Sequence, residues 1–136
     1  MNQQTNVASA QADATGARLP RIAAVLAAII GAMAIFAGGQ VIFMGKIMPY
    51  HVIDWLPVYN FAVGVFSLLV TAGLLWRRAR TAMMAAVGTL ATHALITVIL
   101  LVGYRGIVAG ESLKAMTVRL VVWCIIVGLM VWHRRK

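Results

Sequence analysis

The sequence predicts an all-α integral membrane protein, with four transmembrane helices in an up-down antiparallel bundle and a disordered N-terminal tail. Three observations support this fold class. Only 11% of the 136 residues are charged and 62% are hydrophobic, whereas a soluble domain carries roughly 25% charged residues. Four long apolar runs follow one another along the chain, and basic residues gather at their ends.

Residues 1–20 are rich in Gln, Asn, Ala, Thr and Ser and hold almost no large apolar side chain. Such a segment cannot bury enough surface to offset the entropy lost on ordering. We therefore expect a disordered cytoplasmic tail over 1–20, followed by the four-helix transmembrane domain over 21–136.

The apolar runs cover about 22–45, 58–76, 82–103 and 113–132. About 20 residues of helix span a hydrocarbon core roughly 30 Å thick. The runs are continuous rather than alternating, so each predicts a helix and not a barrel strand. Because the links are short, consecutive helices should be antiparallel neighbours.

The first run could also belong to a signal peptide, with Arg18 and Arg21 as its basic region and Ala32-Met33-Ala34 resembling a cleavage site. Largely apolar sequence continues well beyond Ala34, however, past the roughly 7–15 residues of a signal-peptide core. A retained first helix is the better interpretation.

The basic residues predict the orientation. Eight of the twelve Lys and Arg lie beside the ends that include both termini, three lie on the other side, and Arg119 falls inside a run. The positive-inside rule then places both termini in the cytoplasm and the chain in the inner membrane. Nucleic-acid binding is excluded, because no soluble basic face with interleaved aromatic residues exists. The eight are Arg18, Arg21, Arg77, Arg78, Arg80, Arg134, Arg135 and Lys136, and the three are Lys46, Arg105 and Lys114.

The link before the second run reads PYHVIDWLPVYN over residues 49–60. Its aromatic residues suit the headgroup layer, and a short interfacial helix over 49–56 is compatible with Pro49 at its first position. We interpret His51 and Trp55 as parts of an interfacial loop. No nucleophile or set of metal ligands completes a catalytic pair around His51 and Asp54.

Small and weakly polar residues recur at helical spacing within three of the runs, which is typical of closely packed membrane helices. We predict that these stripes are the packing seams of the bundle. They are Ala27, Gly31, Ala34 and Gly38; Asn60, Gly64, Ser67 and Thr71; and Ala86, Thr89, His93 and Thr97.

Arg119 lies about two turns inside the fourth run, where a charge costs several kcal/mol unless it snorkels to the interface or finds a partner. Both alternatives are open from sequence. The hypothesis is a polar cluster in the outer half of the bundle made of Gln40, Asp54, Asn60, His93 and Arg119, with Asp54 as counter-ion.

No cofactor or metal is expected. The chain has one cysteine, Cys124, so it has no disulfide and no CxxC pair. His93 is the only histidine deep within a run, and one such residue cannot supply paired axial ligands.

Three function classes follow. The first is a non-enzymatic inner-membrane protein that associates with other membrane helices, either copies of itself or subunits of a larger complex. The second is a small-molecule carrier or exporter. In length and hydropathy alone the chain resembles the small multidrug exporters, which need a carboxylate in the first helix that is missing here. The third is a membrane enzyme or cofactor-binding protein that uses the outer histidine, aspartate and arginine side chains.

Overall fold

A computed structural model describes the backbone of residues 2–135 and the side chains of residues 6, 7, 9, 11, 16 and 18–135. The elements in chain order are helices, and the described residues include no strand. They are α1 (Asn2–Met44), α2 (Leu56–Val65), the π-helical turn η1 (Phe66–Thr71), α3 (Ala72–Trp76), α4 (Ala82–Gly103) and α5 (Gly110–Arg135). The first and last residues, which belong to the predicted domains, lie outside the described part.

Four helical segments are long and apolar enough to cross a membrane: Arg18–Met44, Leu56–Trp76, Ala82–Gly103 and Gly110–Arg135. They correspond to the four predicted runs. The all-helical fold class is therefore confirmed, and α4 begins and ends where we predicted. The second segment contains α2, η1 and α3 as consecutive parts of one rod.

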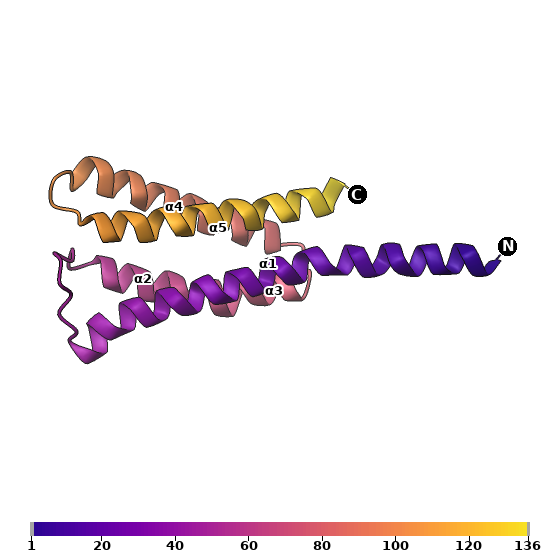
Figure 1. Ribbon diagram of the computed structural model, residues 1–136, viewed down its shortest axis with the longest axis horizontal. Coiled ribbons are helices and arrows are strands. Elements are labelled where there is room, and N and C mark those ends of the chain that lie inside the picture. The colour runs from indigo at the N-terminus through magenta and orange to yellow at the C-terminus, as the bar shows by residue number, and fades with distance from the viewer. Residues whose placement is uncertain (1, 136) are drawn as a thin grey trace.

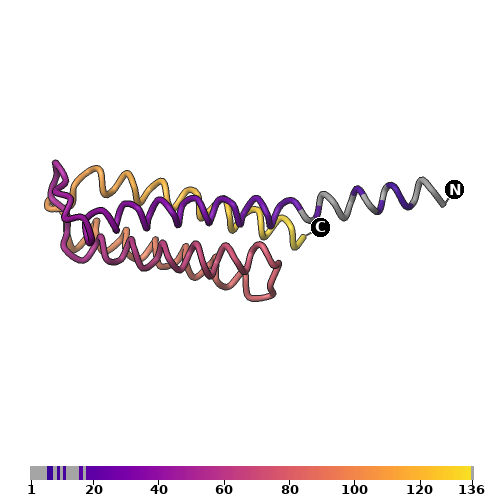
Figure 2. The backbone as a smooth tube through the Cα atoms, turned by 90° about the horizontal axis from the view of Figure 1, so that it is seen from below, coloured from indigo at the N-terminus to yellow at the C-terminus, as the bar shows by residue number. Residues whose placement is uncertain are grey.

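Figure 1 shows the four segments side by side, with the described N- and C-terminal ends toward one side of the molecule. The 45–55 and 104–109 links lie at the opposite end, which we call the link end. Figure 2 shows, from a second direction, that α1 and α5 share one face and that the α2–α3 rod and α4 share the other. The helices thus form two layers of two.

The predicted tail differs from the structure, in which residues 2–20 continue α1 as a helix. This stretch extends beyond the bundle (Figure 1). Its Ala and Gln residues favour helix, and a helix nucleated in the packed segment lengthens at little further cost. The absence of large apolar side chains therefore did not decide the backbone conformation.

The short helix that we considered over 49–56 is not present, because the chain has no helix between Met44 and Leu56. Pro49 would suit a first helical position, but Pro57 lies in the first turn of the next helix, α2, and the segment between them forms the link. Ile53 and Leu56 are instead buried against Leu100 of α4 and Met116 of α5. This link therefore belongs to the protein core at the link end.

The predicted seams are confirmed as buried stripes, with only Asn60 and Thr97 half-buried. Glycine allows α1 and α2 to approach closely. A Cβ at Gly38 would lie 2.5 Å from the Pro57 carbonyl O, and one at Gly64 would lie 2.7 Å from the Ile35 backbone N. These two helices therefore touch along their backbones.

Candidate functional site: a buried arginine beside a cavity

Arg119 points into the bundle. Its residue is 7% exposed, and its Nη1 donates a hydrogen bond to the Oδ1 of Asn60 on α2. The same nitrogen lies 3.7 Å from the Sδ of Met116, one turn earlier on α5. A snorkelling side chain would keep its charged group in contact with water. The structure therefore favours the buried arrangement.

The guanidinium forms no ion pair with the acidic side chains that the structure describes, Asp54 and Glu111. Within the described part of the chain, the one ion pair joins Lys114 Nζ to Glu111 Oε1 at 2.9 Å, and both of those side chains are exposed. Asn60 supplies a neutral amide oxygen. Arg119 is thus a buried cation that is hydrogen-bonded but not neutralised.

A cavity of about 90 Å³ adjoins Arg119 and Asn60 at the link end of the bundle. Because one water molecule needs roughly 10–15 Å³ on this measure, the space admits several waters or a small polar group. Its walls come from α1, α2, α5 and the 45–55 link. The lining residues are Ala37, Val41, Met48, Tyr50, Val52, Leu56, Pro57, Asn60, Glu111, Ser112, Ala115, Met116 and Arg119.

His93 lies in a neighbouring layer of aromatic side chains. Its Nδ1 is 2.7 Å from the Oη of Tyr59, the residue before Asn60. His93 is 3% exposed, and its ring centroid is 6.3 Å from that of Trp123, one turn after Arg119 on α5. The buried indole N–H of Trp123 has no acceptor among the described residues. Three helices thus contribute to a second, mostly aromatic group beside the arginine.

Of the five residues in the predicted cluster, the structure joins Asn60 directly to Arg119, and His93 lies close by through Tyr59. Gln40 is engaged elsewhere. Its Oε1 accepts a hydrogen bond from Lys46 Nζ at 2.8 Å, and its backbone carbonyl accepts one from the Lys46 N–H at 3.2 Å. Gly45 between them has a φ of 58°. A glycine in the left-handed conformation is a common C-terminal cap of a helix. Gln40 therefore helps to cap the C-terminus of α1.

Asp54 was expected to act as the counter-ion of Arg119, and the structure does not pair them. Asp54 is exposed in the turn before α2 and forms no ion pair within the described residues. His51 is exposed as well. Trp55 is half-buried, and its Nε1 donates to the Tyr104 Oη at 2.9 Å. The loop is therefore anchored to the link after α4.

Sequence reasoning missed three neighbours of the cluster. Met116 and Trp123 lie three residues before and four residues after Arg119, so helical spacing alone places them on its face. Tyr59 had no such signal, because its contact with His93 depends on how α2 and α4 pack. Met116 contacts the guanidinium, whereas Tyr59 and Trp123 contact His93.

No group of three His, Cys, Asp or Glu side chains that could hold a metal occurs in the described part of the chain. The deep part of the cavity offers N–H donors, and the carboxylate of Glu111, which also lines the cavity, is paired with Lys114. A guanidinium presents its donors in a planar fork that matches the oxygens of a carboxylate or phosphate. Asn60 adds two amide N–H donors besides its engaged oxygen. This arrangement is suited to binding an anionic oxygen group.

Comparison with known protein families, with curated proteins and with solved structures found no match.

Proposed function

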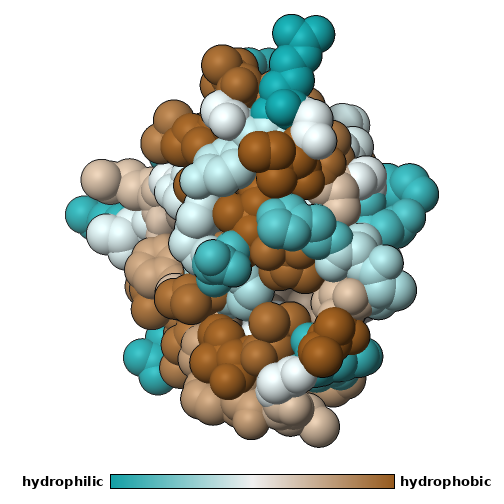
Figure 3. Space-filling model, turned by 90° about the vertical axis from the view of Figure 1, so that its left-hand side faces the viewer, coloured by the Kyte–Doolittle hydropathy of each residue, from teal (hydrophilic) through white to brown (hydrophobic). Residues whose placement is uncertain are grey.

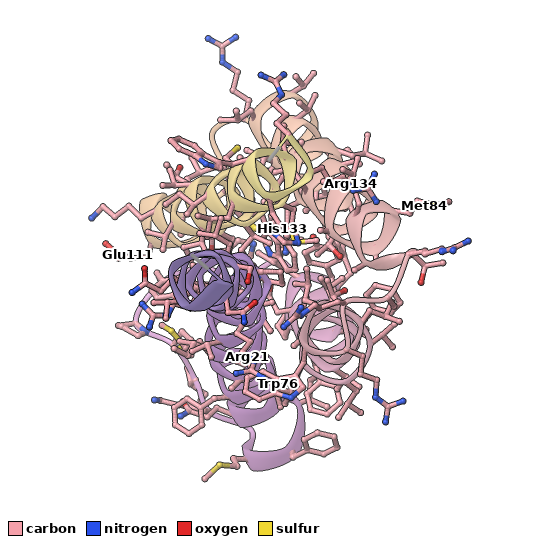
Figure 4. The ribbon with its side chains drawn as sticks, turned by 90° about the vertical axis from the view of Figure 1, so that its right-hand side faces the viewer. Arg21, Trp76, Met84, Glu111, His133 and Arg134 are labelled. Atoms are coloured by element: carbon pink, nitrogen blue, oxygen red, sulfur yellow. The ribbon has the colours of Figure 1, made fainter. Side chains whose placement is uncertain are left out.

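We propose that the chain is inserted in the inner membrane as an up-down antiparallel bundle, with both termini in the cytoplasm. Support comes from the charges. Arg21 lies over the Trp76 ring, with its Cζ 5.7 Å from the ring centroid, at the end of the bundle that holds both termini (Figure 4). Arg134 belongs to that end too, and such basic ends favour the cytoplasmic side. The link end, and the Arg119 cavity with it, then belongs to the opposite half of the membrane.

We further propose that the protein binds an anionic group in the Arg119 cavity. The observation that carries this proposal is a buried guanidinium beside an open space, with no ion pair to a carboxylate among the described residues. A charge in the membrane interior costs several kcal/mol unless it is compensated. An apolar residue at position 119 would pack the helices without that cost. The arginine is therefore explained by a ligand that neutralises it.

The cavity lies toward the link end of the bundle, because residues of the 45–55 link line it. Figure 3 views this end directly and shows hydrophilic side chains among hydrophobic ones over the bundle. Glu111 and Ser112 of the cavity wall lie in the first turn of α5, whereas Arg119 lies about two turns deeper. The anionic group thus binds below the surface and not on it. Of the three function classes, the small-molecule carrier or exporter is the one that this geometry fits.

Thermal unfolding of the purified protein in a neutral detergent tests the proposal. We expect phosphate or acetate to raise the midpoint temperature over chloride at equal ionic strength, because a ligand at 100 times its Kd stabilises the folded state by about 2.7 kcal/mol. Arg119→Gln should abolish the shift. Arg105→Gln, at an exposed cation of the same end, should retain it. Equal shifts in all three proteins, or no shift in the wild type, would contradict the proposal.

A further inference from the structure

The size of the cavity limits what can enter it. Pockets for whole small-molecule ligands measure about 300–1,000 Å³, and the space beside Arg119 measures about 90 Å³. A single carboxylate or phosphate group fits such a volume, but a sugar or nucleotide does not. Any larger ligand must leave most of its atoms outside the cavity.

The cavity lies where α1 and α5 separate. Near the termini these two helices share a core, in which Ala23 and Ala27 pack in one cluster with Trp123 and Ile126. Farther along, α1 turns its small residues to α2, and Figure 1 shows it diverging from α5 toward the link end. Asn60 of α2 also lines the space that results. Because residues of both α1 and α5 line this space, we place its opening between these two helices.

The walls from α1 and α5 are mostly apolar, with Glu111 and Ser112 as the polar residues in the first turn of α5. Ala37 and Val41 of α1 and Ala115 of α5 line the cavity, and none of the three is fully buried. Met48 and Tyr50 of the 45–55 link also line it. In the proposed membrane setting, hydrocarbon chains and not water lie beside α1 and α5 at this depth. A ligand tail that leaves the cavity sideways would enter the lipid.

We infer that the ligand is a membrane-resident amphiphile with one oxyanion head, a carboxylate or a phosphate, whose hydrocarbon tail leaves between α1 and α5. This inference rests on the proposed function and narrows it to a lipid-like ligand. Arg119 and Asn60 hold the head, and Ala37, Val41 and Ala115 contact the first carbons of the tail. One buried cation matches one anionic head.

Native mass spectrometry in a neutral detergent tests the inference with four probes: oleate, dodecyl phosphate, methyl oleate and acetate. Oleate and dodecyl phosphate should bind at concentrations at least about tenfold lower than acetate, a difference of about 1.4 kcal/mol. Methyl oleate, which lacks the charge, should bind more weakly than oleate by a similar factor. Arg119→Gln should remove the preference for the two charged amphiphiles.

A steric variant separates this inference from the proposed function. Ala115→Phe, at an exposed position that lines the cavity, should weaken oleate binding more strongly than acetate binding. Ala91→Phe, at an exposed position of α4 outside the cavity lining, is the matched control and should change neither. If acetate binds as tightly as oleate through Arg119, or if Ala115→Phe has no effect on oleate binding, the inference of an amphiphilic ligand is wrong. The proposed anion binding would not be contradicted by either result. If no anion binds through Arg119, both fail.

Discussion

At the scale of single residues, the charge of Arg119 was the strongest signal in the sequence, because the one other cation within an apolar run, Lys114, lies at the start of that run. From the sequence, the candidate partners of Arg119 were the polar residues expected at a similar depth in the membrane. Asn60 was among them, and the structure pairs the two. Expected depth alone could not distinguish Gln40 and Asp54 from Asn60. Gln40 caps the C-terminus of α1 and Asp54 lies exposed in a turn, and the sequence pattern predicts neither position.

The Tyr59–His93 hydrogen bond should contribute measurably to stability. Tyr59→Phe leaves Nδ1 of a buried His93 without its partner, which costs about 1–3 kcal/mol. A double-mutant cycle with His93→Phe in detergent unfolding experiments should give a coupling energy of about 0.5–3 kcal/mol. Additive effects of the two substitutions would show that this contact has no energetic role.

At the scale of elements, helix positions and packing faces were predictable because membrane helices leave two regular signals, run length and the stripe of small residues. The π-helical turn η1 was not predictable. In it the Ala72 N–H donates to the Ser67 carbonyl, five residues back, and the buried Thr71 Oγ1 lies 3.4 Å from the Thr89 Oγ1 of α4. The position of such an irregular turn depends on contacts between helices, and these contacts leave no local pattern in the sequence.

The close α1–α2 contact predicts a sharp difference between glycines. Gly38→Ala should destabilise the protein by about 1–3 kcal/mol, because its Cβ would meet backbone atoms of α2, which cannot move aside. Gly88→Ala on α4, where a Cβ meets nothing within 4 Å, should instead stabilise it by about 0.4–1 kcal/mol. Denaturation of the two variants under identical detergent conditions checks this, and similar effects at both sites would contradict the observed packing.

At the scale of the whole molecule, the composition predicted the fold class, and the charges predict an orientation. Reporter fusions after Arg135 and within the 77–81 link should report the cytoplasm, while fusions within the 45–55 and 104–109 links should report the opposite side. The positive-inside rule gives this result because eight basic residues flank one end and three the other. A C-terminal fusion exposed outside the cytoplasm would overturn the assigned sidedness.

Association with other membrane helices, as a homo-oligomer or within a larger complex, stays a prediction. Large apolar side chains such as Phe36, Leu69 and Val102 are exposed around the bundle, and lipid covers such a surface as well as a partner helix does. Crosslinking in native membranes, followed by purification in mild detergent, should recover a species larger than the monomer. A strict monomer with no crosslinked partner would exclude stable association.

We propose that Arg119, a buried charge with no counter-ion among the described residues, takes one from a ligand. Asn60→Asp tests it most directly, since it places a carboxylate of nearly the same shape at the atom that Arg119 already contacts. The measurement is the unfolding midpoint of wild type and variant, with and without added phosphate or acetate. We predict a higher midpoint for the variant in anion-poor buffer and no further rise on adding either anion. A variant that is less stable than the wild type, or that responds to anions as strongly, would contradict the claim.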